Sequence, residues 1–390
     1  MAQEFDITII GGGHSGLFLA RALADQGWRL ALVEPRPIGT APATADGRNL
    51  ALMRSSREAA DRFGIWPALA PVVRPVEAVH LREKPGGATL VTTMRELGGR
   101  PFAYGVEHPA LHAALATSLA ELGEPPRIFA NGLRGLERRP EARLLELADG
   151  SRIATRLVIG ADGRGSRLRE LAGIRLDAWR YDQAAISFIV AHTRPHRQTV
   201  HEWMRPRGPL ALLPLPGRRS GVTWVEPEDR ARALVAEGEE ALLRRLGEES
   251  EGVLGDLRLA SRIGIQPLGA QHARRYVAPR LALIGDAAHG VHPIHAQGFN
   301  MAVADIAELA EALARAARRG EDPGGADLLL GYERARWWAN QQRIWMTDGL
   351  NRIFSSEAAW LQPVRSGAIR AVAALPPLRR RLARNRMQLV

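Results

Sequence analysis

The 390-residue chain contains no cysteine, which excludes disulfide bonds, thiolate metal sites and cysteine nucleophiles. Lysine occurs only at Lys84, so arginine supplies almost all of the positive charge behind a net charge of +11. Such an excess favours nucleic acid or an anionic membrane as a partner. The arginines are scattered except near the C-terminus, and no nucleic-acid-binding motif is present. We therefore predict no nucleic-acid partner.

Long apolar runs are also missing, and a membrane-spanning helix would need about 20 apolar residues. The chain starts with Glu4 and Asp6 and lacks the basic and apolar segments of a signal peptide. We expect a cytoplasmic protein, with peripheral contact to the inner membrane as an extension of that expectation. Hydrophobic residues make up 46% and charged residues 24%, which is typical of a globular chain, here long enough for two domains.

A glycine-rich turn lies between an apolar run at residues 7–10 and a helical pattern. Gly11 permits a tight turn, Gly13 lets the backbone approach a pyrophosphate, and Gly16 lets the helix pack close to the strand. The N–H groups at the start of that helix favour a diphosphate. A second apolar run ends at Glu34, 18 residues beyond Gly16, where a ribose-binding acid is expected after about 20. The pattern predicts a dinucleotide site and disfavours NADP there; a tight turn without a ligand is the alternative.

Two further motifs end apolar runs with an acid and a glycine. In residues 157–169 the run leads to Asp162-Gly163, with Ser166 placed to start a helix. In residues 281–300 a run leads to Gly285-Asp286, followed by a loop and a long helical pattern. Acids at the carboxyl ends of strands are typical ligand-binding positions in α/β folds. Asp162 as a mere turn cap is the alternative.

In this order the three motifs resemble the FAD-dependent aromatic hydroxylases of the para-hydroxybenzoate hydroxylase fold. Finer matches point to the ubiquinone-biosynthesis hydroxylases; they lie at residues 46–52, 104–108, 212–215, 292–300, 347–354 and 375–378. The resemblance implies an α/β fold with a Rossmann-like FAD-binding domain, an inserted, mostly antiparallel β substrate domain and a helical C-terminal tail. We expect the FAD domain at 1–75, 98–182 and 268–345, the substrate domain at 76–97 and 183–267, and the tail at 346–390.

The resemblance also implies the cofactor and the chemistry. NADH or NADPH would bind only transiently to reduce FAD, since no second glycine-rich fingerprint is present. A flavin C4a-hydroperoxide formed with O₂ would then hydroxylate the ring of a ubiquinone precursor. The tail of that precursor is expected to be polyprenyl. The FAD-binding residues implied are Gly11, Gly13, His14, Ser15, Gly16, Glu34, Arg36, Arg48, Asp162, Gly285, Asp286, Pro293, Gln297, Gly298, Phe299 and Asn300.

One departure lies in the loop before the long helix, where His295-Ala296 replaces the small residues, often Ala-Gly, of the family. Alanine is penalised at positive φ where glycine is not, so the loop over the flavin is expected to be reshaped. His295 and Gln297 are the candidate catalytic residues, although no base is identified. The spacing of His289, His292 and His295 suggests a metal site, which we reject because His292 precedes a proline and the family uses no metal.

The C-terminal arginines alternate with apolar residues, which is typical of a basic amphipathic helix on an anionic membrane. A solvated helix packed on the body by its apolar stripe is the alternative. Residues 230–246 predict another amphipathic helix. Four functions stay open: the ubiquinone hydroxylase, a hydroxylase of a soluble phenol or secondary metabolite, an isoprenoid reductase, and a non-catalytic subunit of a quinone-biosynthesis complex.

Overall fold

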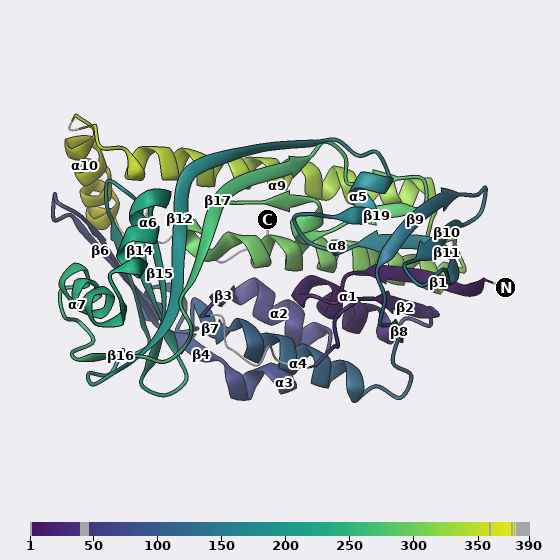
Figure 1. Ribbon diagram of the computed structural model, residues 1–390, viewed down its shortest axis with the longest axis horizontal. Helices are drawn as coiled ribbons and strands as arrows, with labels where there is room; N and C mark the ends of the chain where they lie inside the picture. The colour runs from purple at the N-terminus through teal and green to yellow at the C-terminus, as the bar shows by residue number, and fades with distance from the viewer. Residues whose placement is uncertain (1, 40–46, 359, 376, 378, 380–390) are drawn as a thin grey trace.

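The computed structural model describes residues 2–39, 47–358, 360–375, 377 and 379. A first, mainly parallel sheet has the central order β19-β11-β1-β2-β8 and lies on the right of Figure 1. Its strands are β1 (Gln3–Ile10), β2 (Leu30–Val33), β8 (Arg127–Phe129), β9 (Leu133–Arg138), β10 (Arg143–Leu147), β11 (Arg152–Gly160), β18 (Val277–Ala278) and β19 (Leu281–Leu283). Strands β2 and β19 are buried along their whole length and β1 over its last four residues, as is typical of parallel strands covered on both faces.

Four long helices cover this sheet and form the largest apolar core with it. They are α1 (His14–Ala24), α4 (His108–Ala120), α8 (Gln297–Arg319) and α9 (Ala326–Ser355). Helix α1 packs between α4 and α8, and α8 packs against α9. The register joins Ile7 to both Leu30 and Leu157, so the carboxyl ends of β1, β2 and β11 meet at one edge. The first two sequence motifs therefore lie side by side.

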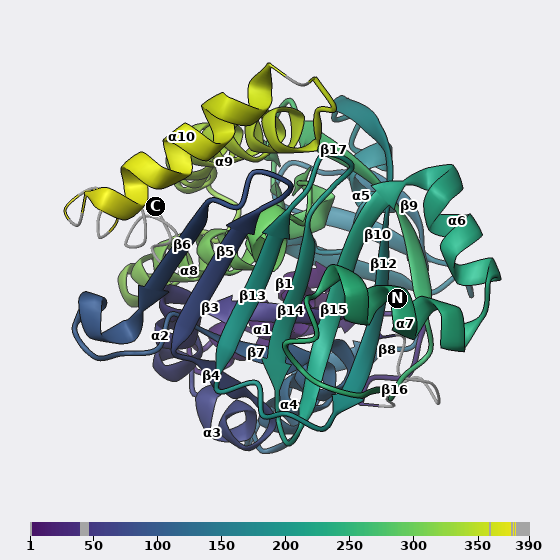
Figure 2. The same cartoon turned by 90° about the vertical axis from the view of Figure 1, so that its left-hand side faces the viewer.

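A second sheet, seen on the left of Figure 1 and face-on in Figure 2, has the order β20-β17-β12-β15-β14-β13-β5-β6. Its strands are β5 (Ala78–Glu83), β6 (Thr89–Thr93), β12 (Leu176–His192), β13 (Thr199–Met204), β14 (Leu210–Leu215), β15 (Arg219–Pro227), β16 (Leu257–Leu259), β17 (Gly264–Ala273) and β20 (His289–Gly290). The pairs are antiparallel except β5 with β13. Helices α6 (Glu228–Ala236) and α7 (Glu239–Glu249) bury Phe188, Trp203 and Trp224 on one face.

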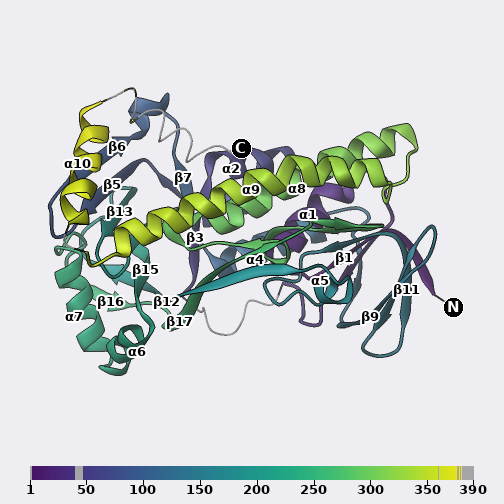
Figure 3. The ribbon, with the colours of Figure 1, turned by 90° about the horizontal axis from the view of Figure 1, so that it is seen from above.

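A small antiparallel sheet, β3-β7-β4, lies between the two larger ones. Its strands and the remaining helices are β3 (Asn49–Met53), β4 (Arg74–Val76), β7 (Ala103–Glu107), α2 (Arg54–Arg62), α3 (Trp66–Leu69), α5 (Arg167–Leu171) and α10 (Leu361–Ala374). Short 3₁₀ turns occupy 70–72, 94–97, 285–287 and 294–296. Figure 3 looks down on α9, which crosses the molecule, and on α10 at its end. A helix able to cross a bilayer is absent from the described residues.

The expected α/β class is confirmed. The domain limits stay a prediction, which the pairing of β5 and β6 with the second sheet supports, although β12 and β17 run across two of the limits. The single helix predicted over 230–246 is wrong. Gly238 adopts φ +93 and separates α6 from α7, because a left-handed residue cannot continue a helix. Residue 46, the first of the matched stretch 46–52, lies outside the described residues.

Candidate active site

The glycine turn after β1 has the geometry that the sequence predicts. Gly11 adopts φ +105, donates its N–H to the Val33 carbonyl at 2.8 Å and would clash with Ala161 if it carried a Cβ. A Cβ on Gly16 would lie 1.8 Å from the Gly11 carbonyl oxygen, so only glycine lets α1 approach the turn. A Cβ on Gly13, in contrast, would meet no protein atom within 4 Å. Gly13 is therefore free of packing constraints, and the space beside it is open to a ligand.

Glu34 closes the turn from the end of β2. Its Oε2 accepts the Gly12 N–H at 2.7 Å, and its Oε1 accepts both the backbone N–H and the Nε of Arg36. Burial alone would raise the pKa of Glu34, but the hydrogen bonds from Arg36 and Gly12 outweigh it and lower the pKa. The carboxylate is thus charged, and the Arg36 side chain beside it is 80% exposed. Both side chains are placed at the edge where α1 begins.

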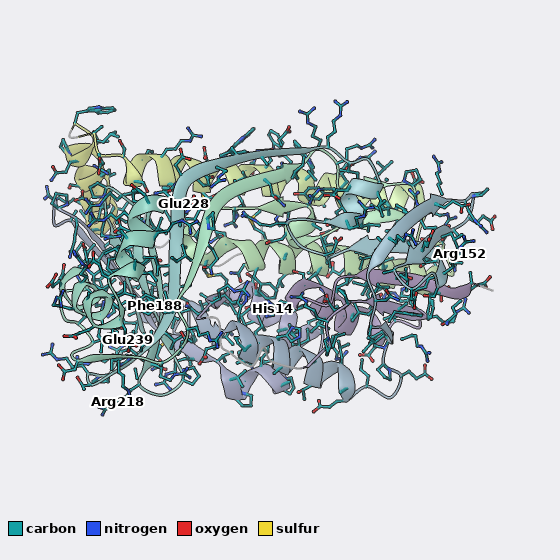
Figure 4. The ribbon with its side chains drawn as sticks, viewed as in Figure 1. His14, Arg152, Phe188, Arg218, Glu228 and Glu239 are labelled. Carbon is teal, nitrogen blue, oxygen red and sulfur yellow. The ribbon has the colours of Figure 1, made fainter. Side chains whose placement is uncertain are left out.

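The start of α1 meets the start of α8, which brings the first and third motifs together. Figure 4 places His14 near the middle of the molecule. Its ring lies edge-on to Phe299 at 5.9 Å and to His108 at 4.4 Å, and its Nε2 is 3.0 Å from the His108 carbonyl oxygen. The His108 N–H in turn donates to the carbonyl of Arg48, whose side chain is exposed. The segments that contain His14, Arg48, His108 and Phe299 therefore meet at this point of the fold.

The second motif serves the protein's own structure. Asp162 is half-buried, and its oxygens accept the Ser166 hydroxyl at 2.5 Å and the Leu168 N–H at 3.1 Å. Ser166 caps α5 by accepting the N–H of Arg169, as its sequence position predicts. The Asp162 carboxylate is thus occupied as a turn and helix cap. Its assignment to FAD stays a prediction, and the geometry favours the structural alternative for the side chain.

The third motif turns sharply at Gly285, which has φ +55. A Cβ there would approach the Ser15 hydroxyl and the Ala302 methyl group to 3.0 Å, so glycine lets this turn reach both α1 and α8. The next side chain, Asp286, is exposed although surrounding protein desolvates it and raises its pKa, with Arg164 and His289 acting in the opposite direction. An accessible carboxylate at this turn is suited to accept hydrogen bonds from ligand hydroxyl groups.

A buried polar network behind Gly285 escaped sequence reasoning. Asp305 of α8 is fully buried and accepts hydrogen bonds from the Gly285 N–H at 3.1 Å and His289 Nε2 at 2.6 Å. It also accepts from Arg336 Nε at 3.0 Å and Asn340 Nδ2 at 2.9 Å, both on α9. Burial would raise the pKa of Asp305, but His289, Arg336 and Asn340 together lower it to about 2. A carboxylate on the apolar stripe of a predicted helix was the signal that could have revealed it.

In the loop before α8, one residue has a left-handed backbone conformation at the position where the family has small residues, often Ala-Gly. Ala296 adopts φ 52 and ψ 39 immediately before α8. Asn300 stabilises this turn, since its Nδ2 donates to the Ala296 carbonyl at 2.7 Å and to Ala51 at 2.9 Å. Its Oδ1 accepts the Met53 N–H and the Ser56 hydroxyl. The side chain of Asn300 therefore joins the loop to β3 and α2, and only its backbone is left for a cofactor.

The other residues of this loop differ in accessibility. Gln297 is buried and its Oε1 accepts from Arg343 Nη1 at 3.1 Å, which links the start of α8 to α9. Pro293 and Gly298 are half-buried. The side chain of His295 lies outside the described part of the structure. Among described residues, no group of three or more histidine or acidic side chains is arranged to hold a metal ion.

The second sheet presents a carboxylate toward the same loop. Alternate residues of a strand face opposite sides. In β13, Trp203 packs under α6 and α7. Val200 instead lies in an apolar cluster with Ala296, and Met204 in one with Ile294. Glu202 lies between Val200 and Met204, so it faces the loop side, and it is half-buried. The alternation of residues 199–204 was the signal that could have identified it.

Comparison with known proteins agrees with this arrangement. The model of the family described as "FAD binding domain" matches residues 4–344. Ubiquinone hydroxylase UbiL of Rhodospirillum rubrum is 36% identical over 98% of this chain and 89% of its own. The 3-demethoxyubiquinol 3-hydroxylase of Escherichia coli is 31% identical over 93% and 92%.

Solved structures share the fold. The p-nitrophenol 4-monooxygenase PnpA of Pseudomonas putida superposes with a TM-score of 0.82 at 18% identity, covering 100% of this chain and 99% of that one. PqsL of Pseudomonas aeruginosa, a probable FAD-dependent monooxygenase, has a TM-score of 0.79 at 23% identity over 95% and 100%. The chain belongs to the FAD-dependent aromatic hydroxylases, in the branch that contains the ubiquinone hydroxylases.

Proposed function

We propose that the protein hydroxylates the aromatic ring of a polyprenylated ubiquinone precursor, with NADH or NADPH as reductant and O₂ as oxidant. The observation that carries this proposal is the match to ubiquinone hydroxylases along almost the whole chain, at 36% identity in one case. The expected FAD dependence and monooxygenase class are confirmed by the family match.

The residues present fit FAD. The open space beside Gly13 and the N-terminus of α1 suit a diphosphate, Glu34 suits ribose hydroxyls, and the exposed Asp286 suits a polyol chain. When bound, FAD supplies the O₂ activation and oxygen transfer that side chains lack. The first N–H groups of α8, which have no partner within the helix, would stabilise negative charge on the reduced ring. Apolar residues around Ile294 would exclude water from that ring.

Glu202 is the group we propose to accept a hydrogen bond from the phenolic hydroxyl of the substrate. It faces the loop at residues 294–296 from the second sheet, with Val200 and Met204 on either side. A carboxylate in apolar surroundings bonds strongly to such a donor and would draw electron density toward the ring. His295 and Gln297 stay predictions as further catalytic residues; the buried Gln297 already accepts a hydrogen bond from Arg343.

Membrane contact through the basic tail and membership of a quinone-biosynthesis complex stay proposals. Three of the C-terminal arginines already have protein partners. Buried Arg365 donates to the carbonyls of residues 353, 354 and 356, Arg370 donates to the carbonyl of Gly86, and Arg379 pairs with Glu96. Ile369 is likewise buried in the body. Residues 380–390, with the other tail arginines, lie outside the described residues. Equal pelleting of full-length and tail-deleted protein with anionic vesicles would overturn a role of the tail.

The function is tested in two steps. Purified protein should be yellow, oxidise NADH or NADPH in air and add one hydroxyl group to a prenylated phenol. Cells without the gene should accumulate a quinone precursor that lacks that hydroxyl, as mass spectrometry of lipid extracts would show. Turnover of only a soluble phenol, with unchanged cellular quinones, would favour the second candidate, a hydroxylase of secondary metabolites.

A further inference from the structure

Exposed large apolar side chains gather on one side of the molecule. Among the described residues, nine such side chains are exposed, and seven of them fall within residues 338–375. The seven are Trp338, Trp345, Met346, Ile353, Trp360, Val364 and Leu375. Single exposed apolar residues need no explanation, but a contiguous group of them marks an interaction surface. We call the outward faces of residues 331–375 the α9–α10 surface; it lies along the top of Figure 1 and faces the viewer in Figure 3.

The spacing on α9 confirms that these residues share a face. Trp338, Trp345, Met346 and Ile353 are separated by 7, 8 and 15 positions from the first, which is close to whole helical turns. The rings of Trp338 and Trp345 meet edge-on at 5.5 Å. The opposite face of α9 is buried on the body. That buried face is largely polar, with Arg336, Asn340, Thr347 and Asn351, so α9 carries large apolar side chains on its exposed face, unlike an ordinary surface helix.

Arginines outnumber carboxylates among the charged residues of the α9–α10 surface. Between residues 331 and 353, the exposed charged residues are Arg334 and Arg352, and on α10 the exposed charged residue is Arg370. Glu357, between the helices, is the exposed carboxylate of the stretch, while half-buried Asp348 is paired with Arg352. Arginines flanking exposed tryptophans complement an anionic bilayer. A second copy would bring the same positive charges together and is disfavoured.

The inner side of the same helices reaches the candidate site. Leu350 and Phe354 of α9 and Ile369 of α10 pack in one apolar cluster with Ile294 of the loop before α8. An apolar path thus joins the α9–α10 surface to the loop at residues 293–297. A long hydrocarbon chain approaching from a bilayer would meet apolar side chains along that path.

We propose that the α9–α10 surface docks on an anionic lipid bilayer, with Trp338, Trp345 and Trp360 in the headgroup region. The docking is peripheral, because no described helix can cross a membrane. Delivery of a polyprenylated substrate from the bilayer rests on the proposed function, whereas docking itself does not.

The test is flotation of the full-length holoenzyme with vesicles of phosphatidylcholine alone or mixed with phosphatidylglycerol. We expect binding to the mixed vesicles that weakens as salt rises, and a roughly tenfold or greater loss in a variant with Trp338→Gln, Trp345→Gln and Trp360→Gln. A matched control carries Val91→Gln and Ile128→Gln, which remove exposed apolar side chains elsewhere, and should bind as the wild type does. Flavin content and melting temperature establish that both variants are folded.

Three outcomes would overturn the proposal: no vesicle binding by the wild type, equal binding by the tryptophan variant, or a dimer that the tryptophan variant dissociates. Turnover of a short-chain, water-soluble phenol is measured in parallel. A variant that loses vesicle binding but keeps this turnover supports the docking surface. If the wild type and all variants lack turnover while the wild type binds vesicles as expected, the result counts against the proposed function and leaves the docking surface in place.

Discussion

The guanidinium of Arg169 donates from Nη1 to the carbonyl oxygen of Ala287 at 2.8 Å. Its Nη2 donates to the carbonyl of Arg164 at 2.9 Å, and the side chain is buried. One arginine thus joins the motif at residues 160–169 to the motif at 285–287. This buried residue therefore links the turn that carries Asp162 to the turn that carries Asp286.

Replacement of Arg169 by methionine should loosen both turns. The buried Ala287 carbonyl would lose its side-chain donor, whereas the Arg164 carbonyl would keep Gln271 Nε2 at 3.3 Å. An unsatisfied buried carbonyl costs roughly 1–3 kcal/mol, so we expect the free energy of unfolding to fall by about that amount. Urea denaturation measures that loss. Arg167→Met on the same helix is the control, because Arg167 is 53% exposed and should change stability little. Equal stability of the two variants would contradict the stabilising role of the Arg169 hydrogen bonds.

Asp305→Asn should destabilise the protein and change how its stability depends on pH. The lowered pKa of Asp305 means that its stabilisation is complete above about pH 4 and is lost as pH falls toward 2. Removal of the charge also leaves His289 and Arg336 buried without their carboxylate, which costs about 3–5 kcal/mol. Denaturation between pH 7 and pH 2 measures both effects. The exposed Asp25, changed to Asn, should leave the curve almost as it was.

Ala296→Gly should stabilise the loop before α8. A left-handed conformation costs an L-residue roughly 1–2 kcal/mol that glycine does not pay, against a smaller gain in unfolded-state entropy. We expect a net gain of about 0.5–1 kcal/mol by chemical denaturation. Ala335→Gly, in the exposed middle of α9, should instead cost about 1 kcal/mol. A loss at both positions would show that Ala296 is not strained.

Gly13→Ala and Gly16→Ala separate cofactor binding from folding. A methyl group on Gly13 meets no protein atom, so that variant should fold normally but bind FAD roughly 10- to 100-fold more weakly. A methyl group on Gly16 would overlap the Gly11 carbonyl, so that variant should lose stability before any question of FAD arises. Calorimetry of the apoproteins with FAD compares them. Unchanged affinity in Gly13→Ala would place the diphosphate elsewhere.

Glu202→Gln should reduce hydroxylation more than it reduces NADH oxidation. Loss of a charged hydrogen bond worth about 1.5–3 kcal/mol predicts a 10- to 100-fold fall in kcat/KM for the phenol. The fraction of NADH that yields hydroxylated product should fall as well. Glu228→Gln, at the start of α6 on the covered side of the sheet, is the control (Figure 4). Wild-type values of kcat/KM in Glu202→Gln would remove this residue from the substrate site.

Local patterns predicted the parts of the fold that local physics determines. Gly11, Gly16 and Glu34 have the geometry expected of them because a strand, a glycine turn and a helix leave few alternatives. The long helical pattern predicted after Gly285-Asp286 is α8, which begins at Gln297. At Gly238, by contrast, the apolar periodicity continued through a residue whose backbone ends the helix.

Contacts between distant segments could not be predicted from the chain alone. Asp305 gains its role only because α9 brings Arg336 and Asn340 beside it, and Arg169 because β11 and β19 are neighbours. Asn300 was expected at the cofactor, whereas its side chain is engaged by β3 and α2. The Asp162 side chain likewise caps a turn. Side-chain partners depend on tertiary packing, which spacing along the sequence does not encode.

Turnover under ¹⁸O₂ tests the central claim most directly. The holoenzyme is supplied with NADH or NADPH and a prenylated phenolic precursor, and the mass of the product is measured by mass spectrometry. An FAD-dependent ring hydroxylase should add one ¹⁸O atom to the ring for each hydroxyl formed. A product without the label, or steady oxidation of the nicotinamide with no hydroxylated ring, would contradict the account.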